Sequence, residues 1–173
     1  QALQKTAKDN GYQFKVLDAL IEVNEHQKRI LFERVKAYYN GDLDGKTFAI
    51  WGLSYKPDTD DIREAPSLYL IDDLLAAGAH VQAYDPEAMA NVEQHYKSAP
   101  GLKLTTGSYE ALTSADALLI LTEWSMFKEP DFTRIAKQLR SPVIFDGRNM
   151  YSPEVIQEHS FYYESIGRPT IKP

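Results

Sequence analysis

Cysteine is absent from this chain of 173 residues, which excludes several kinds of chemistry at once. Without cysteine these residues hold no disulfide framework, no thiolate zinc site and no thiol nucleophile. Long apolar runs are missing too: none approaches the roughly 20 residues of a membrane span, and the polar start of the chain lacks the apolar segment of a signal peptide. We therefore expect a protein that works in the reducing cytoplasm, away from membranes.

Positive charge is also scarce, because 19 Lys and Arg face 25 Asp and Glu, a formal net charge of -6. A general binder of nucleic-acid phosphates needs the opposite balance, so a local basic cluster has to meet any anionic ligand. The hydrophobic fraction of 43% suffices for one sizeable core and excludes a disordered or fibrous chain. Since the chain opens without Met, we expect a piece of something longer.

The first 41 residues are predicted to be helical. A short helix over residues 1–8 ends at Asn10-Gly11, a pair suited to the left-handed turn that closes a helix. From Phe14 onward apolar residues recur mainly at intervals of three, four and seven until Asn40-Gly41, which predicts a helix of about 26 residues. Such a helix is roughly 39 Å long, about three times the ~13 Å radius of gyration of a domain of about 100 residues. Another surface must therefore pack on it.

The pattern changes after residue 42 to alternating strands and helices. Short β-branched or aromatic runs predict buried strands at residues 47–51, 81–84, 117–121 and 143–145, with a possible fifth at 161–164. Helical stretches occupy residues 66–77, 86–95, 109–113 and 131–139. This alternation predicts an α/β fold, a Rossmann-like parallel sheet with helices on both faces, preceded by the long helix. We divide the chain into a helical segment, 1–41, for linkage or dimerisation, and a domain, 42–173.

The loop after the first predicted strand carries the most chemistry, because ligands of such sheets gather at the carboxyl ends of the strands. Residues 52–67 hold Lys56 and Arg63 and lead into a helix. Gly52 is the one glycine where a dinucleotide fingerprint needs three, so this chain is not expected to be a complete NAD site. The alternative interpretation is that the charged residues 60–64 form a solvated turn that caps the next helix.

A second basic residue follows the fourth predicted strand. Arg148 lies beside Gly147, whose small size lets the backbone approach a ligand. An arginine binds a phosphate or carboxylate with two hydrogen bonds, whereas a lysine acts as a mobile point charge. Lys56 and Arg148 are therefore predicted to converge on one anion.

Other polar residues at strand ends leave alternatives open. Glu123 and Trp124 follow the third predicted strand, where Trp124 either packs the loop or contacts a ligand. Asp85, before a proline, resembles the ribose-binding acid of a Rossmann half, but we favour a helix start there. No metal site is expected, because no two of the four histidines (residues 26, 80, 95 and 159) have metal-ligand spacing on one element.

Four segments together carry a family resemblance. They are GLSYKPDTDDIREAPS at 52–67, YDP at 84–86, TEW at 122–124 and FDGRN at 145–149. In this order they resemble the carboxyl-terminal half of the UDP-glucose 6-dehydrogenases, within the UDP-glucose/GDP-mannose dehydrogenase family. The resemblance runs through nearly the whole chain, and the FDGRN segment favours UDP-glucose over UDP-N-acetylmannosamine or GDP-mannose.

This resemblance implies an enzyme with an amino-terminal NAD-binding domain, a long central helix and a carboxyl-terminal UDP-binding domain. Such enzymes oxidise UDP-glucose to UDP-glucuronate in two steps through a cysteine thiohemiacetal and thioester. The cysteine and the glycine-rich NAD loop of the family lie outside these residues, so the chain by itself is expected to be inactive. The rival hypotheses are a stand-alone nucleotide-sugar-binding module, a dehydrogenase for a related nucleotide sugar, and a purely structural Rossmann-like domain.

The resemblance also implies roles for individual residues. Tyr55 and Lys56 would contact the UDP-sugar, Arg148 would reach the same ligand from the facing loop, and Arg63 would meet the NAD pyrophosphate. Tyr55 stands where phenylalanine is common in the family, which keeps the aromatic edge and adds a hydroxyl.

The long helix predicts assembly independently of the resemblance. Its apolar stripe overhangs a small domain, and such a stripe is rarely left in water. We expect a homodimer in which two copies of the helix cross about a two-fold axis. The alternative is that an amino-terminal domain covers the stripe. The apolar residues concerned are Leu17, Leu20, Ile21, Val23, Leu31 and Val35.

Overall fold

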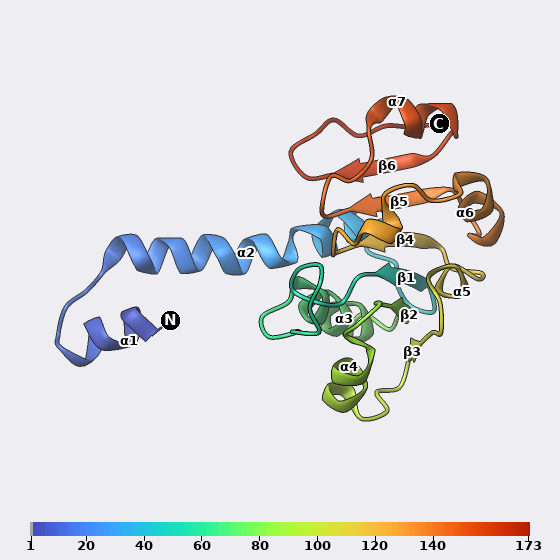
Figure 1. Cartoon of the computed structure of the whole chain (residues 1–173). Helices are drawn as coiled ribbons and strands as arrows, with labels where there is room; N and C mark the ends of the chain where they lie inside the picture. Colours follow the sequence, from blue (N-terminus) through green and yellow to red (C-terminus); the bar gives the residue numbers. More distant parts are fainter. Residues whose placement is uncertain (1) are drawn as a thin grey trace.

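The computed structural model describes residues 2–173, and it shows a parallel six-stranded sheet between helices with one long helix projecting from it (Figure 1). The strands are β1 (Thr47–Trp51), β2 (His80–Tyr84), β3 (Leu102–Leu104), β4 (Ala117–Ile120), β5 (Val143–Asp146) and β6 (Tyr162–Ser165). The helices are α1 (Ala2–Asp9), α2 (Lys15–Tyr38), α3 (Pro66–Ala76), α4 (Met89–Tyr96), α5 (Ser108–Ala111), α6 (Phe132–Gln138) and α7 (Pro153–Glu158), with a 3-10 turn at Ser125–Phe127. The predicted Rossmann-like α/β class is confirmed.

The strands lie in the order β3-β2-β1-β4-β5-β6, and every pair is parallel. The chain therefore moves outward from β1 in one direction, returns to place β4 on the other side of β1, and continues outward again. The strand order reverses between β1 and β4. The loops that follow these two strands therefore lead to opposite sides of the sheet, which leaves a crevice at the carboxyl ends of the two strands.

Alternate side chains of β1 pack into two hydrophobic cores, one on each face of the sheet. Phe48 and Ile50 pack with the cluster that includes α2, α3 and α4. Ala49 and Trp51 pack with the cluster on the other face, beside α5, α6 and α7. Strands covered on both faces read as continuous apolar runs, which explains why β1, β4 and β5 were predictable from the sequence.

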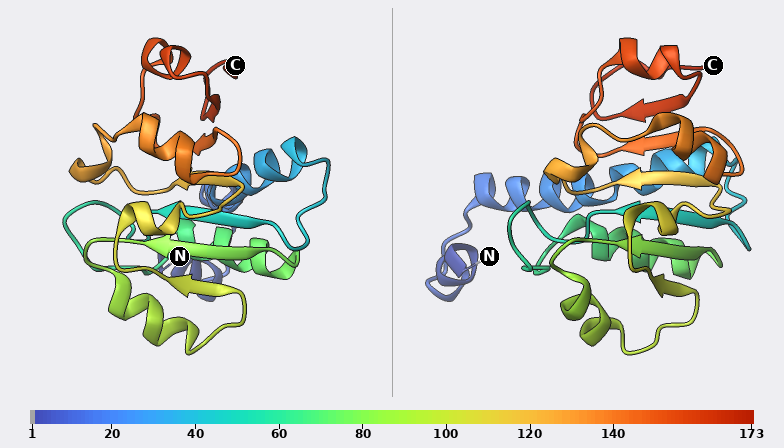
Figure 2. Two further views of the ribbon diagram at one scale, coloured as in Figure 1. Left: turned by 90° about the vertical axis from the view of Figure 1, so that its right-hand side faces the viewer. Right: turned by 45° about the vertical axis from the view of Figure 1, so that its right-hand side comes forward.

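Helix α2 is buried over its carboxyl-terminal half only. Leu31 and Val35 are buried in the core, whereas Val16, Leu20 and Val23 are 76%, 59% and 63% exposed. Figure 2 shows this amino-terminal half leaving the body of the domain, with α1 at its far end. The predicted overhang of the long helix is confirmed; Leu17 and Ile21 are half-buried, and Val16, Leu20 and Val23 are exposed.

The predicted boundaries agree with the structure to within a few residues. Helix α2 ends at Tyr38, followed by left-handed Asn40 and Gly41, as predicted. The predicted first helix begins at Gln1, which lies outside the described residues. The possible fifth strand is present as β6, one residue later than predicted.

Besides the 3-10 turn, two short elements were not predicted. Strand β3 has three residues at the edge of the sheet, which is too short for an apolar pattern to show. Helix α7 is six residues long and buries one side chain, that of Ile156, so it has almost no apolar periodicity. Its start was marked by Ser152 and Pro153, a cap residue followed by a proline in the first turn.

No helix within residues 2–173 combines the length and the apolar character that crossing a membrane requires.

Gly52 lets the ends of β1 and β4 meet. Its backbone is left-handed, with φ of +90°, and its N–H donates to the carbonyl of Tyr84 at 2.9 Å. A Cβ built on Gly52 would lie 2.5 Å from the Cβ and 2.6 Å from the backbone nitrogen of Thr122. Glycine is therefore required here for both conformation and space.

Replacing Gly52 by alanine is expected to lower the free energy of unfolding by about 2 kcal/mol or more, because the left-handed conformation alone costs an L-residue roughly 1–2 kcal/mol. Gly45→Ala is the matched control: Gly45 is also left-handed, at φ +69°, but has open space around its Cβ position. Urea denaturation of both variants separates the two costs. Equal losses of stability would contradict the close approach at Thr122.

Candidate functional site

A cavity of about 430 Å³ opens at the carboxyl ends of the strands, where the order of the sheet reverses. It is walled by the loops after β1, β4 and β5 and by one face of α2. Three of the four predicted site residues line it together, namely Tyr55, Lys56 and Arg148. Cavities at this point of a parallel sheet, with convergent polar groups, are where such folds bind ligands.

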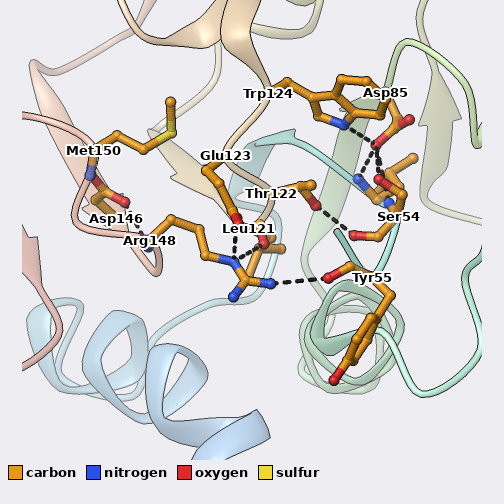
Figure 3. A network of polar contacts seen from close by, with 11 residues as sticks. Ser54, Tyr55, Asp85, Leu121, Thr122, Glu123, Trp124, Asp146, Arg148 and Met150 are labelled. Atoms are coloured by element: carbon orange, nitrogen blue, oxygen red, sulfur yellow. Dashed lines mark hydrogen bonds and ion pairs between the residues drawn. The ribbon is translucent and has the colours of Figure 1, made fainter. Parts of the chain in front are cut away.

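Arg148 connects three loops by its guanidinium (Figure 3). Its Nε donates to the carbonyl of Leu121 at 2.6 Å and lies 3.2 Å from the Glu123 carboxylate, while Nη2 donates to the carbonyl of Tyr55 at 3.2 Å. Two of the five guanidinium N–H groups are thus used on backbone carbonyls. Three N–H groups stay available for a ligand in the cavity.

The backbone of Arg148 is held by Asp146, the last residue of β5. The fully buried carboxylate of Asp146 accepts hydrogen bonds from the backbone N–H groups of Arg148 at 2.8 Å and Met150 at 2.7 Å. It also accepts from the Tyr163 hydroxyl at 2.7 Å. Burial, together with the nearby charge of Asp146, raises the pKa of Tyr163, so this hydroxyl stays a donor at neutral pH.

Asp85 occupies the corresponding place at the end of β2 and is also fully buried. Its Oδ2 accepts from the backbone N–H groups of Leu53 and Ser54, at 2.7 and 3.0 Å, and from the indole N–H of Trp124 at 3.0 Å. Its Oδ1 accepts from the backbone N–H groups of residues 87–88 at the turn into α4. The helix favoured from the sequence begins three residues later than predicted, at Met89, with Ala88 rather than Asp85 as its N-cap. Asp85 instead holds the turn before the helix and also contacts two other loops, which the sequence did not indicate.

The hydrogen bonds of Asp85 determine its charge. Burial by itself would raise the pKa of this carboxyl, but the backbone N–H groups that it accepts from outweigh burial and lower the pKa below its ordinary value. Asp85 therefore stabilises the folded state at neutral pH, and this contribution is lost as the pH falls through the lowered pKa.

The side chains of Tyr55 and Lys56 extend away from this network. Tyr55 is 52% exposed and its backbone N–H donates to the carbonyl of Asp61 at 2.8 Å. Among the described residues, the Lys56 ammonium makes no hydrogen bond or ion pair. The loop is fixed by its backbone while its cation stays available at the cavity.

A third cation of the cavity wall, Lys28 on α2, was missed by the sequence analysis. It donates to Glu25 at 2.7 Å, to Glu64 and to the Tyr69 hydroxyl at 3.1 Å. Burial lowers the pKa of Lys28, but the hydrogen bonds to the two carboxylates outweigh it and raise the pKa above its usual value. The charge of Lys28 is therefore already matched within the protein. The spacing of Glu25 and Lys28 on one helical face was the available signal.

At the end of β4, the structure decides between the two alternatives left open for Trp124. Trp124 is only 7% exposed, and its indole N–H donates to Asp85. Trp124 therefore packs the loop and is not placed to contact a ligand. Glu123 lines the cavity and forms the ion pair with Arg148.

Arg63 does not join this cavity. Its guanidinium donates two hydrogen bonds to the Asp61 carboxylate, of 2.9 and 2.7 Å, and these lower the pKa of Asp61 to about 2. The Arg63 side chain is 87% exposed and lines a separate hollow of about 620 Å³, together with Asn91 and His95 of α4. The structure thus places Arg63 apart from the other three predicted site residues.

The residues present do not form a dinucleotide cradle by themselves. Gly52 is required by its contact with Thr122, and the Asp85 carboxylate, at the position of a ribose-binding acid, accepts six hydrogen bonds from the protein itself. Within residues 2–173 no cluster of three or more His, Cys, Asp or Glu side chains is arranged to hold a metal ion.

The fold and this cavity define a Rossmann-like α/β domain that presents cations at the switch point of its sheet. Residues 49–153 match the family model described as the UDP-binding domain of the UDP-glucose/GDP-mannose dehydrogenase family. The chain belongs to this family, as its sequence motifs indicated.

Several known proteins resemble this chain over nearly its whole length. A UDP-glucose 6-dehydrogenase of Pseudomonas aeruginosa is 44% identical over 172 residues, covering 98% of this chain and 38% of the relative. The UDP-glucose 6-dehydrogenase TuaD of Bacillus subtilis is 40% identical, covering 99% of this chain and 36% of the relative. The solved UDP-glucose dehydrogenase of Pyrobaculum islandicum is 26% identical with a TM-score of 0.74, covering 86% of this chain and 32% of that one. This chain therefore spans well under half the length of these relatives.

Proposed function

We propose that this chain is the UDP-binding portion of an NAD-dependent UDP-glucose 6-dehydrogenase, which oxidises UDP-glucose to UDP-glucuronate. The observation that carries the proposal is the meeting of Lys56 and Arg148, from the ends of β1 and β5, at one cavity. The identity of 44% to a UDP-glucose 6-dehydrogenase over nearly the whole chain supports the choice of substrate. Cytoplasmic location stays a prediction from the sequence.

A related nucleotide sugar is the second candidate. A solved structure described as a UDP-D-ManNAc dehydrogenase, from Pyrococcus horikoshii, has a TM-score of 0.63 and is 26% identical to this chain over 84% of its length. A stand-alone nucleotide-sugar-binding module would use the same residues. All these candidates share recognition of a nucleoside diphosphate, which is the part that Lys56 and Arg148 would perform.

Diphosphate recognition follows from the two kinds of cation. The three free N–H groups of Arg148 form a planar fork with a fixed position, because its other two N–H groups are bound to loop carbonyls. Lys56 adds a mobile point charge from the facing loop. Tyr55, exposed beside Lys56, would supply an aromatic edge to the nucleotide.

Arg148→Ala is expected to weaken the binding of UDP by about 1.5–3 kcal/mol, because it removes charge-assisted hydrogen bonds to the ligand. Isothermal titration calorimetry of this chain with UDP measures the change. Arg34→Ala is the matched control: Arg34 donates to Glu164 and to the carbonyl of Ser165, and it does not line the cavity.

Lys56→Ala is the second arm of the same test. Lys56 makes no hydrogen bond or ion pair among the described residues, so its loss should weaken binding with little change in the melting temperature. Unchanged titrations for both Arg148→Ala and Lys56→Ala would remove the cavity from the binding site. Absence of UDP binding by the unmodified chain would favour the purely structural hypothesis.

We further propose that this chain alone is inactive and that NAD binds mainly to other parts of the enzyme. The chain has no cysteine to form a covalent intermediate, and Arg63 is its one proposed contact to the NAD pyrophosphate. An assay of NADH formation with UDP-glucose and NAD should therefore read background, and calorimetry should detect no NAD binding. Turnover by this chain would overturn the covalent mechanism.

Homodimerisation through α2 is the proposed assembly, supported by its uncovered apolar residues. A Val16→Glu, Leu20→Glu variant should shift sedimentation equilibrium at tens of micromolar from dimer to monomer. Val155→Glu, which places the same charge on exposed α7, is the control and should leave the dimer intact. A monomeric wild type, or a dimeric double variant, would defeat the proposal in favour of another domain covering this helix.

A further inference from the structure

One buried carboxylate ties together the loops that follow β1, β2 and β4. Oδ2 of Asp85 gathers the backbone N–H groups of Leu53 and Ser54, the Ser54 hydroxyl at 3.1 Å and the Trp124 indole, while Oδ1 holds the turn at residues 87–88. Figure 3 shows Ser54 and Trp124 both pointing at Asp85. None of these contacts reaches the cavity, so Asp85 is not a ligand contact.

We propose that Asp85 is a positioning residue, which sets the Tyr55–Lys56 segment for the nucleotide. This inference rests on the proposed UDP binding. Ser54, held by Asp85 through its N–H, is the residue directly before this segment. The carbonyl of Ser54 accepts from the Thr122 hydroxyl at 2.6 Å, and the carbonyl of Tyr55 accepts from Arg148 at 3.2 Å.

The chain of contacts therefore runs from Asp85 to the Tyr55–Lys56 segment and on to Arg148. Asp85 holds residues 53–54 by their backbone N–H groups. The position of residues 53–54 determines where the carbonyl of Tyr55 lies. That carbonyl is one of the two backbone acceptors that orient Arg148. The backbone N–H of Tyr55 is bound as well, to Asp61. With its backbone held at each step, the segment loses little freedom when the nucleotide binds, which is the benefit of a preorganised site.

The contacts require a carboxylate rather than an amide. Both oxygens of Asp85 receive N–H donors from the protein, four donors on Oδ2 including a hydroxyl and two on Oδ1. An asparagine of the same shape offers one oxygen and one NH₂ group, so one set of donors would face another donor. Asp85→Asn therefore releases either the Leu53–Ser54 loop or the turn into α4 without removing any atom from the cavity.

The test compares UDP affinity of the wild type and Asp85→Asn by calorimetry, at a temperature where circular dichroism shows both to be fully folded. Asp85→Asn should bind UDP about tenfold more weakly or worse, and amide hydrogen exchange at Leu53 and Ser54 should accelerate relative to β5. A purely structural role would lower the melting temperature but leave the affinity of the folded protein unchanged.

Asp116→Asn is the matched control, because Asp116 accepts a backbone N–H from Thr47, the first residue of β1, at 2.8 Å, at the end of the strand opposite to the loop that Asp85 holds. It should lower stability and keep UDP affinity. Trp124→Phe decides if Asp85→Asn does not fold, or if it releases only the turn into α4 and leaves exchange at Leu53 and Ser54 unchanged. Trp124→Phe removes one donor and keeps the carboxylate: a loss of about threefold or more supports the positioning role.

The outcomes separate the two proposals. Failure of the wild type to bind UDP overturns the proposed function and the positioning role with it. Binding by the wild type together with equal affinity in an Asp85→Asn variant whose Leu53 and Ser54 amides exchange faster, or in Trp124→Phe where that variant decides, overturns the positioning role alone. An equal loss of affinity in Asp116→Asn also overturns it, because the effect would then follow general stability.

Discussion

The close approach of β1 and β4 at their carboxyl ends is the constraint on which the candidate site depends. Gly52 and Thr122 pack without room for a side chain at Gly52, so the two loops leave the sheet in contact and part only afterwards. This contact brings residues 53–55 within reach of the loop that carries Leu121 and Trp124. The hydrogen bonds of Arg148 and Asp85 are possible because these loops are already adjacent.

Charge at the site is balanced pair by pair, which explains how an acidic chain can present cations to an anion. Lys28 is matched by Glu25 and Glu64. Outside the cavity, Arg63 is matched by Asp61 in the same way. Arg148 shares its charge with Glu123 but keeps three N–H groups free, and Lys56 makes no hydrogen bond or ion pair among the described residues. The net charge of -6 therefore says little about this cavity, where local pairing decides which cations remain for a ligand.

The sequence predicted those parts of the site that depend on single segments. Lys56 and Arg148 were identifiable because each follows an apolar strand, and parallel strands end at one edge of the sheet. The contacts of Asp85 were not, because they join three loops whose meeting depends on the packing at Gly52. Lys28 was missed because one of its two carboxylate partners, Glu64, lies 36 residues away. Strand β3 escaped prediction since three edge residues carry no pattern.

Helix α2 belongs to both the cavity and the surface proposed for assembly. Asn24, Gln27 and Lys28 line the cavity, and Leu31 and Val35 one to two turns later are buried in the core. The exposed apolar residues lie on the preceding turns of the same continuous helix. Lys28 of α2 also binds Glu64, at the end of the loop that carries Lys56. A shift of α2 against the sheet would therefore move the α2 wall of the cavity and, through this ion pair, the loop that carries Lys56. The geometry of the cavity therefore depends on whatever surface packs against α2.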